Sequence, residues 1–171
     1  MSSRYLSVFG AAALSLVVAA CSGGEHGDMG GMEGMDMGGH GGEEITFGEA
    51  GMASMASRTI TVTIEDSAYD LKDLKVKNGE VIRFIIVNKD ETEHEFTLGT
   101  AEMQAADRKM MAMQADHGDS MEMAVPNSVS VGELETKELT WKFAGSGMIE
   151  FACNVPGHYE GGMKGDIMIM N

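Results

Sequence analysis

From Arg58 onward the chain is built from short runs that alternate apolar and polar residues, and this period of two constrains the fold more than any other feature. The run from Thr59 to Ile64 alternates cleanly, and the run from Glu80 to Asn88 follows the turn signal Asn78-Gly79. Five further runs of the same kind cover residues 94–98, 128–131, 136–143, 148–153 and 165–170. Glycine, proline, asparagine and acidic residues separate them. Many short strands of this kind predict an all-β sandwich or barrel.

One segment breaks the strand pattern. From Ala101 to about Gln114 the residues are mostly Ala, Glu, Gln, Lys and Met, with none that is β-branched, which favours a helix. We therefore expect a single all-β domain over residues 58–171, interrupted by a short helical insertion at about residues 100–124.

Three side chains that bind soft metals follow one another at steps of five residues in a single loop. They are Cys153, His158 and Met163, and the loop also holds Pro156 and several glycines. A second imidazole, His94, lies far upstream at the end of a strand-like run. A trigonal set of two His and one Cys, with a weak axial Met, is the ligand set of mononuclear electron-transfer copper. The pattern predicts one copper ion bound by His94, Cys153, His158 and Met163.

Each of these residues also has an ordinary interpretation. His94 alone could be a surface strand residue, His158 a loop imidazole, and Met163 an apolar residue that enters the last strand. Their joint placement outweighs these alternatives. Met163 is the least secure of the four, because the axial position of such sites tolerates substitutes.

The first twenty residues have the pattern of an export signal. Arg4 lies in a short polar start, an apolar run follows from Val8 to Ala20, and Cys21 comes directly after small residues. Cleavage before Cys21 and lipidation of its sulfur would anchor a bacterial lipoprotein; an ordinary signal peptide cut nearby is the alternative. We expect export to the periplasm, with a lipid anchor in the outer membrane. Cys153 would then lack a disulfide partner, which favours metal coordination.

Residues 21–57 are rich in Gly, Met, His and acidic residues and poor in side chains that build a core. Such a composition predicts a flexible tether. Thioethers favour Cu(I), so this segment and the helical insertion could supply additional weak Cu(I) sites, or they could be an inert spacer and packing material. The residues concerned are Met29, Met32, Met35, Met37, Met52, Met55, His26 and His40 in the tether, and Met103, Met110, Met111, Met113, Met121, Met123 and His117 in the insertion.

The formal net charge of −15 restricts the partners. Nucleic acid and anionic lipid would repel this chain, so we expect no nucleic-acid partner and contact with a membrane only through the lipid anchor. A docking partner would be basic, either a redox protein or a copper-handling protein, and we expect the chain itself to be a monomer.

Taken together, the motif and its strand context resemble the cupredoxin family over residues 58–171. The resemblance implies a Greek-key sandwich of seven to eight strands with a type 1 copper site at one end. It also implies that His94 closes one strand, while Cys153, His158 and Met163 come from the loop that joins the last two strands. The family often has Asn after the first His ligand; here Glu95 follows His94, so the hydrogen bonding to the thiolate is left open.

The Met- and His-rich segments make the chain look closest to the exported cupredoxins associated with copper tolerance. Two functions follow from this resemblance: single-electron transfer through Cu(I)/Cu(II), or copper tolerance and buffering with extra Cu(I) bound by these segments. A copper enzyme would need a second copper centre. The chain has five His, no His-x-His pair and no adjacent Cys-His pair, so we expect it not to be an enzyme.

Overall fold

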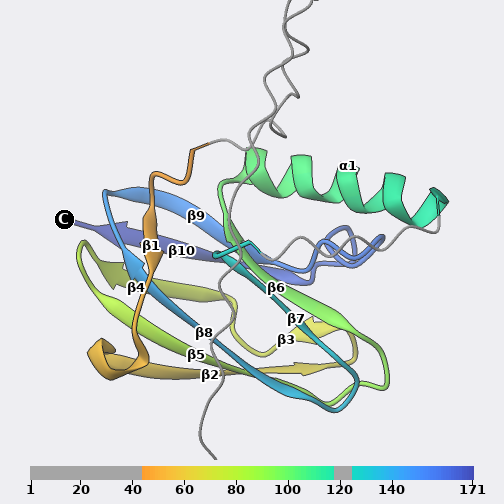
Figure 1. The fold of residues 1–171 in the computed structure, drawn as a ribbon, viewed down its shortest axis with the longest axis horizontal. Coiled ribbons are helices and arrows are strands. Elements are labelled where there is room, and N and C mark those ends of the chain that lie inside the picture. Colours follow the sequence, from red (N-terminus) through yellow and green to blue (C-terminus); the bar gives the residue numbers. More distant parts are fainter. Residues whose placement is uncertain (1–43, 118–124) are drawn as a thin grey trace, which may run out of the picture. The chain divides into compact units, whose positions relative to one another are not determined.

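Two five-stranded β-sheets face each other in a computed structural model that describes residues 44–117 and 125–171 (Figure 1). One sheet has the order β1-β8-β5-β2-β3, and the other has the order β4-β10-β9-β6-β7. The strands are β1 Gly48–Ala50, β2 Arg58–Glu65, β3 Ala68–Tyr69, β4 Asp73–Lys77, β5 Val81–Asn88, β6 His94–Gly99, β7 Ser128–Val131, β8 Thr136–Phe143, β9 Gly147–Ala152 and β10 Lys164–Met170. The all-β sandwich that the alternation predicts is confirmed.

Alternation along the strands builds the core between the sheets. In β5 every second residue is buried, so that Ile82, Phe84 and Ile86 point inward. In β2, Val62 and Ile64 do the same from the neighbouring strand. Because successive side chains of a strand point to opposite faces, this pattern fixes which face of each sheet meets the other.

Pairing between β6 and β9 determines where the predicted ligands meet. The two strands run antiparallel, with Thr97 opposite Ala152 and Leu98 opposite Phe151. The beginning of β6 therefore lies beside the end of β9, at the same end of the sheet. His94 is the first residue of β6, so it begins this strand and does not close one as the resemblance implies. Cys153 follows the last residue of β9.

The sandwich begins earlier in the chain than the expected boundary at residue 58. Strand β1 pairs with β8, and the buried ring of Phe47 packs against Trp141 at 5.5 Å between centroids. A Cβ on Gly48 would lie 2.1 Å from the carbonyl oxygen of Lys142, so glycine is required at the point where β1 begins to pair with β8. The end of the expected tether therefore belongs to the fold. The sequence did not indicate this, because a strand of three residues that contains glycine is too short to show alternation.

Two more strands bring the total in the described residues to ten, above the seven to eight expected. Strand β3 has only two residues. Strand β4, Asp73-Leu-Lys-Val-Lys77, buries Leu74 and Val76 and exposes charged residues between them. It pairs in parallel with β10, and its two apolar residues alone are a weak signal for a strand.

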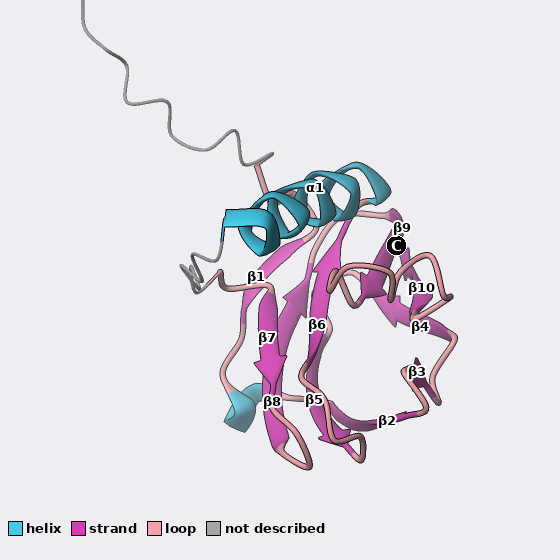
Figure 2. Cartoon of the chain, turned by 90° about the vertical axis from the view of Figure 1, so that its right-hand side faces the viewer, coloured by secondary structure: helices cyan, strands magenta, loops and turns pink. Residues whose placement is uncertain are grey.

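The predicted helical insertion is confirmed as α1, Ala101–His117, which packs against β6 and β9 at the top of the view in Figure 2. The hydroxyl of Thr100 accepts a hydrogen bond from the N–H of Met103 at 3.2 Å and caps the helix start. A single 3₁₀ turn, η1, covers Ala53–Met55.

Several expectations fall on residues that the structure does not describe. They are the signal segment, Cys21, the tether up to residue 43, and Met121 and Met123 of the insertion. Among the residues that are described, no helix combines the length and apolar character needed to cross a membrane.

Candidate metal centre

Three of the four predicted ligands converge at one end of the sandwich. The Nδ1 atoms of His94 and His158 lie 3.2 Å apart, and the sulfur of Cys153 lies 4.0 Å from Nδ1 of His94 and 3.4 Å from Nδ1 of His158. All three donor atoms lie within 4.8 Å of one another. His94 comes from β6, Cys153 from the end of β9, and His158 from the loop between β9 and β10. Segments 59 residues apart in the chain therefore form one cluster.

Met163 is bonded through its backbone to two residues of this cluster. Its side chain is fully buried, and its backbone is joined to two ligands: Cys153 N–H donates to the Met163 carbonyl at 3.1 Å, and Met163 N–H donates to the His158 carbonyl at 2.9 Å. The backbone places Met163 beside the site, while its role as axial ligand stays a prediction.

Tight turns shape the loop that carries these ligands. The N–H of His158 donates to the Val155 carbonyl at 3.0 Å, and the N–H of Gly161 donates to the Gly157 carbonyl at 3.0 Å. Gly157 and Gly162 have φ of 87° and 93°, a region that side-chain-bearing residues rarely adopt. Pro156 fixes one more dihedral. Glycine is therefore favoured at positions 157 and 162 by the backbone geometry of the loop.

The sulfur of Cys153 is buried and receives a backbone hydrogen bond. The N–H of Glu95 points at Sγ from 3.4 Å. A backbone donor makes this bond independent of the side chain at position 95, which answers the question raised by Glu95 after His94. Burial raises the pKa of the Cys153 thiol to about 11, although N–H groups of Glu95 and Val155 act in the opposite direction. A metal must therefore displace a proton from this sulfur.

Copper affinity should consequently rise with pH. A thiol with a pKa of about 11 is protonated at neutral pH, so each unit of pH increases the thiolate fraction, and with it the apparent affinity for Cu(II), about tenfold. Burial and the neighbouring His94 lower the pKa of His158, so that this imidazole is already neutral and does not add to the slope. Competition titrations between about pH 7 and about pH 9 against a chelator of known proton affinity measure this slope. A flat profile would show that Cys153 does not bind the metal.

The other ring nitrogen of His94 is held by a carboxylate that sequence analysis missed. Nε2 of His94 lies 3.0 Å from Oδ2 of Asp90 and 3.2 Å from Oγ1 of Thr92. Because Nδ1 faces the cluster, Nε2 is the protonated nitrogen of the ring, and its N–H donates a hydrogen bond to the Asp90 carboxylate. Metal-binding histidines commonly make this contact, which fixes the tautomer and the ring orientation.

Asp90 is itself firmly placed. It accepts hydrogen bonds from the N–H groups of Asp66 at 2.9 Å and Ser67 at 2.8 Å. Burial alone would raise the pKa of Asp90, but these bonds and the contact with His94 outweigh it and lower the pKa. The carboxylate is therefore ionised at neutral pH. The sequence offered one weak signal for Asp90: it is an acidic residue in a polar loop, four positions before a predicted ligand.

Asn88 organises the loop that carries Asp90. Its side-chain amide donates to the carbonyls of Thr92 at 2.7 Å and Gly132 at 2.9 Å, and its Oδ1 accepts the N–H of Asp90 at 2.9 Å. On the other side of the site, the buried hydroxyl of Tyr69 donates to the Glu95 carbonyl. Both residues fix the backbone on either side of His94.

Replacing Asp90 with Asn should weaken Cu(II) binding by about ten- to hundredfold, the range typical for outer-sphere partners of metal ligands. The amide removes the negative charge that stabilises the metal-bound imidazole, so we also expect a higher reduction potential. Equilibrium titration and voltammetry measure the two effects. Asp70→Asn is the matched control, because Asp70 also accepts a backbone N–H, that of Thr63 at 2.8 Å, but away from the ligands. Equal behaviour of the two variants would refute a role for Asp90.

The donor set of the cluster fits copper. Two neutral imidazole nitrogens and one thiolate sulfur, with a thioether buried beside them, combine the ligands that suit both Cu(II) and Cu(I). The sulfur and His94 are shielded from solvent, and only His158 is partly exposed. Such a cluster can hold one metal ion and let electrons reach it through a single imidazole edge.

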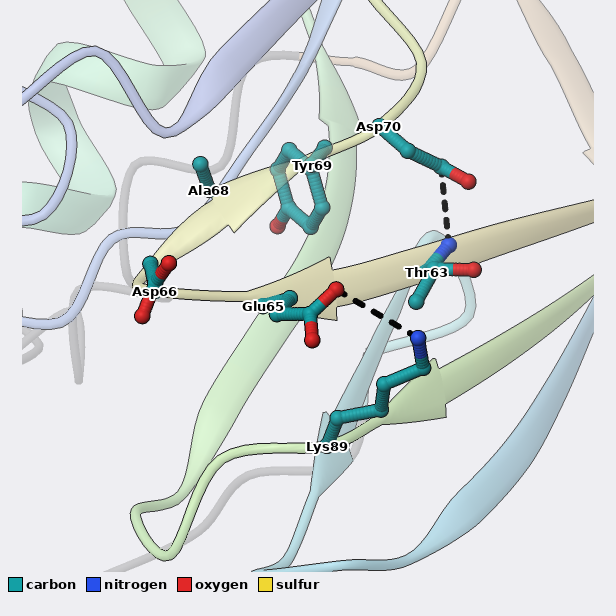
Figure 3. Close-up of a pocket in the computed structure, with 7 residues that line it drawn as sticks. All are labelled: Thr63, Glu65, Asp66, Ala68, Tyr69, Asp70 and Lys89. Carbon is teal, nitrogen blue, oxygen red and sulfur yellow. Dashed lines mark hydrogen bonds and ion pairs between the residues drawn. The ribbon is translucent and has the colours of Figure 1, made fainter.

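The pocket in Figure 3 is a separate feature. This hollow of about 310 Å³ lies beside β2 and β3, and the metal cluster does not line it. Two pairs of groups in its lining bond to each other: Lys89 with Glu65 at 3.4 Å, and Asp70 with the N–H of Thr63 at 2.8 Å.

Comparison with known proteins agrees with the geometry. Residues 45–163 match the family described as "Cupredoxin-like domain". The chain is 36% identical over 148 residues to a protein of Pseudomonas aeruginosa named "Copper-resistant cuproprotein CopI", covering 72% of this chain and 82% of that one. It is 37% identical over 128 residues to the protein of the same name from Rubrivivax gelatinosus, covering 74% of each. Among solved structures, auracyanin B superposes with a TM-score of 0.59 at 20% identity, covering 74% of this chain and 97% of that one.

Proposed function

The chain belongs to the cupredoxin-like family, and from this premise we propose that its metal centre holds one copper ion that carries single electrons by cycling between Cu(I) and Cu(II). The observation that carries the proposal is the convergence of His94, Cys153 and His158 within 4.8 Å. Two of these ligands are completely buried on strand ends, so the scaffold resists their movement when copper changes oxidation state.

Electrons would enter and leave through His158. It is the only one of the three clustered ligands that reaches solvent, and its ring packs beside that of His94 at 4.9 Å between centroids. We propose that a redox partner docks over this edge and that its contact surface is basic, since the chain carries a net charge of −15.

A second function, copper tolerance, is supported by two observations. The relatives from P. aeruginosa and R. gelatinosus are named as copper-resistant cuproproteins. In addition, several thioethers in the described part of the chain are exposed, although Met usually packs inside: Met52, Met55, Met110, Met113, Met148, Met168 and Met170. Thioethers prefer Cu(I), so the surface methionines would hold extra ions while the main centre stores copper or, as Cu(II), accepts one electron from a surface Cu(I) and passes it to a redox partner.

Copper stoichiometry separates the two functions. We would load the full chain and a chain shortened to residues 44–171 with copper in parallel, and record visible absorption and bound metal. One copper with strong thiolate-to-copper absorption in both supports electron transfer alone. Further Cu(I) bound by both chains assigns copper collection to the exposed methionines of residues 44–171, and further Cu(I) bound mainly by the full chain assigns it to the N-terminal segment. Absence of the absorption from both would overturn the copper centre.

We also propose that the protein is exported and anchored through lipid on Cys21. The pattern of residues 1–21 supports this proposal. Cys21→Ser should move the protein from the membrane fraction to the soluble periplasmic fraction without changing the absorption of the copper centre. Retention of the variant in the membrane fraction would contradict the anchor.

A further inference from the structure

Helix α1 contacts the ligand loop at two points, and each point directly follows a proposed copper ligand. Gln104 and Arg108 are four positions apart and therefore lie on one face of the helix. Gln104 bonds to Asn154, the residue after Cys153, and Arg108 stacks on Tyr159, the residue after His158. Figure 1 shows α1 running above the blue loop between β9 and β10 that carries both neighbours.

The first contact is a buried amide bridge. The side chain of Asn154 donates to Oε1 of Gln104 at 2.8 Å, and both residues are almost completely buried. The side-chain nitrogen of Gln104 donates to the Thr97 carbonyl of β6 at 2.9 Å and lies 3.5 Å from the Glu150 carbonyl of β9. Gln104 thus joins the helix to both strands that carry the buried ligands. Breaking this bridge would leave buried polar groups without a partner, which is costly.

The second contact is a cation–π interaction between Arg108 and the ring of Tyr159. The guanidinium carbon of Arg108 lies 3.6 Å from the centre of the Tyr159 ring, and its Nε lies 3.3 Å from the carboxylate of Glu160. Lys164 also lies over this ring, 4.2 Å from its centre, and donates to the Tyr159 hydroxyl at 2.8 Å. That hydroxyl donates to Glu150 at 2.8 Å. Tyr159 is therefore held by cations, by a carboxylate and by the helix at once.

We propose that α1 is a clamp on the ligand loop and that Gln104 and Arg108 are positioning residues for Cys153 and His158. The proposal rests on the proposed copper centre. The backbone hydrogen bonds within the loop join residues 153–163 to one another, and the strands hold the loop at Sγ of Cys153 and at the Tyr159 hydroxyl. Helix α1 adds a separate support, because it contacts the residue that follows each of two ligands. A centre whose ligands must stay in place through a redox cycle gains from such support, because ligand geometry is only as rigid as the residues around it.

The test compares Arg108→Ala with Arg108→Lys and Lys109→Ala. Lysine keeps the charge over the ring, and Lys109 is an exposed neighbour on the same helix, which makes K109A the matched control. In the copper-free protein, R108A should speed amide exchange at His158 and Met163 by about three- to tenfold, the loss expected for a cation–π contact. R108K should restore most of the protection, and K109A should leave it unchanged.

In the copper-loaded protein, R108A should alter the shape of the thiolate-to-copper absorption and the Cu(II) electron paramagnetic resonance spectrum. Gln104→Ala should do so more strongly. Exchange at Phe84, in the opposite sheet, reports global stability. Two results would overturn the clamp. One is that R108A speeds amide exchange equally at Phe84 and in the ligand loop; the other is that its copper spectra are identical to those of K109A. Should R108A fail to fold, Arg108→Gln removes the charge and the guanidinium group but keeps a polar side chain of intermediate length, and it is read in the same way. If the wild-type protein shows the thiolate-to-copper absorption, the copper centre stands even where the clamp is refuted. If the wild-type protein lacks this absorption, the copper centre itself is refuted.

Discussion

Cys153→Ser should abolish the thiolate-to-copper absorption completely and lower Cu(II) affinity by more than about hundredfold. This loss exceeds the range seen when outer-sphere partners are changed, because the strongest donor of the cluster is removed. A serine hydroxyl fills nearly the same volume but does not ionise near neutral pH, so the buried site would keep its shape and lose its charge. Visible absorption and a competition titration measure the two effects.

Cys21→Ser serves as the control for this experiment, since it removes the other cysteine of the chain. It should keep both the absorption and the affinity. Charge-transfer absorption that survives in C153S, or that is lost in C21S, would place the copper-binding thiolate elsewhere and refute the site.

The largest effect on stability is expected from Phe96→Ala. Phe96 is fully buried two residues after His94, and its ring contacts three others: Phe151 at 5.4 Å, Phe84 at 5.2 Å and Tyr69 at 5.7 Å between centroids. Phe84 belongs to the opposite sheet, so the lost ring leaves a cavity between the two layers. Such truncations lower the free energy of unfolding by about 3–5 kcal/mol.

Urea unfolding of the copper-free protein measures this change directly, because bound copper would add its own stabilisation to the folded state. Phe96→Leu is the matched variant. It keeps most of the apolar volume and should cost less than about half as much. A loss below about 1 kcal/mol in F96A would mean that the neighbouring rings close the cavity.

Much of the fold could be predicted because its long strands alternate over enough residues to be seen. Strands β2, β5 and β8 each have eight residues, and the residues that they bury are apolar except for Asn88 of β5. The helix was predictable for a similar reason, since its composition lacks β-branched residues throughout. The short strands β1 and β3 depend on pairing with partners far away in the chain, and local sequence does not encode a partner.

The candidate site shows the same division. Cys153, His158 and Met163 share one loop, so their spacing alone indicates a metal site. The groups that hold them in place do not share a motif. Asp90 reaches His94 across a loop, and Gln104 reaches Asn154 from a helix that interrupts the strand pattern. The first contact depends on the conformation of a polar loop and the second on the pairing of β6 with β9, and the sequence shows neither.

The order of the strands also affects how readily the domain aggregates at high concentration. The four strands at the sheet edges are β1, β3, β4 and β7, with three, two, five and four residues. Unpaired edges are templates on which other chains can add strands, and short or charged edges resist this. β4, the longest of the four, exposes Asp73, Lys75 and Lys77. The eight-residue strands all lie inside the sheets, so the sandwich is protected from edge-to-edge aggregation whether or not it carries copper.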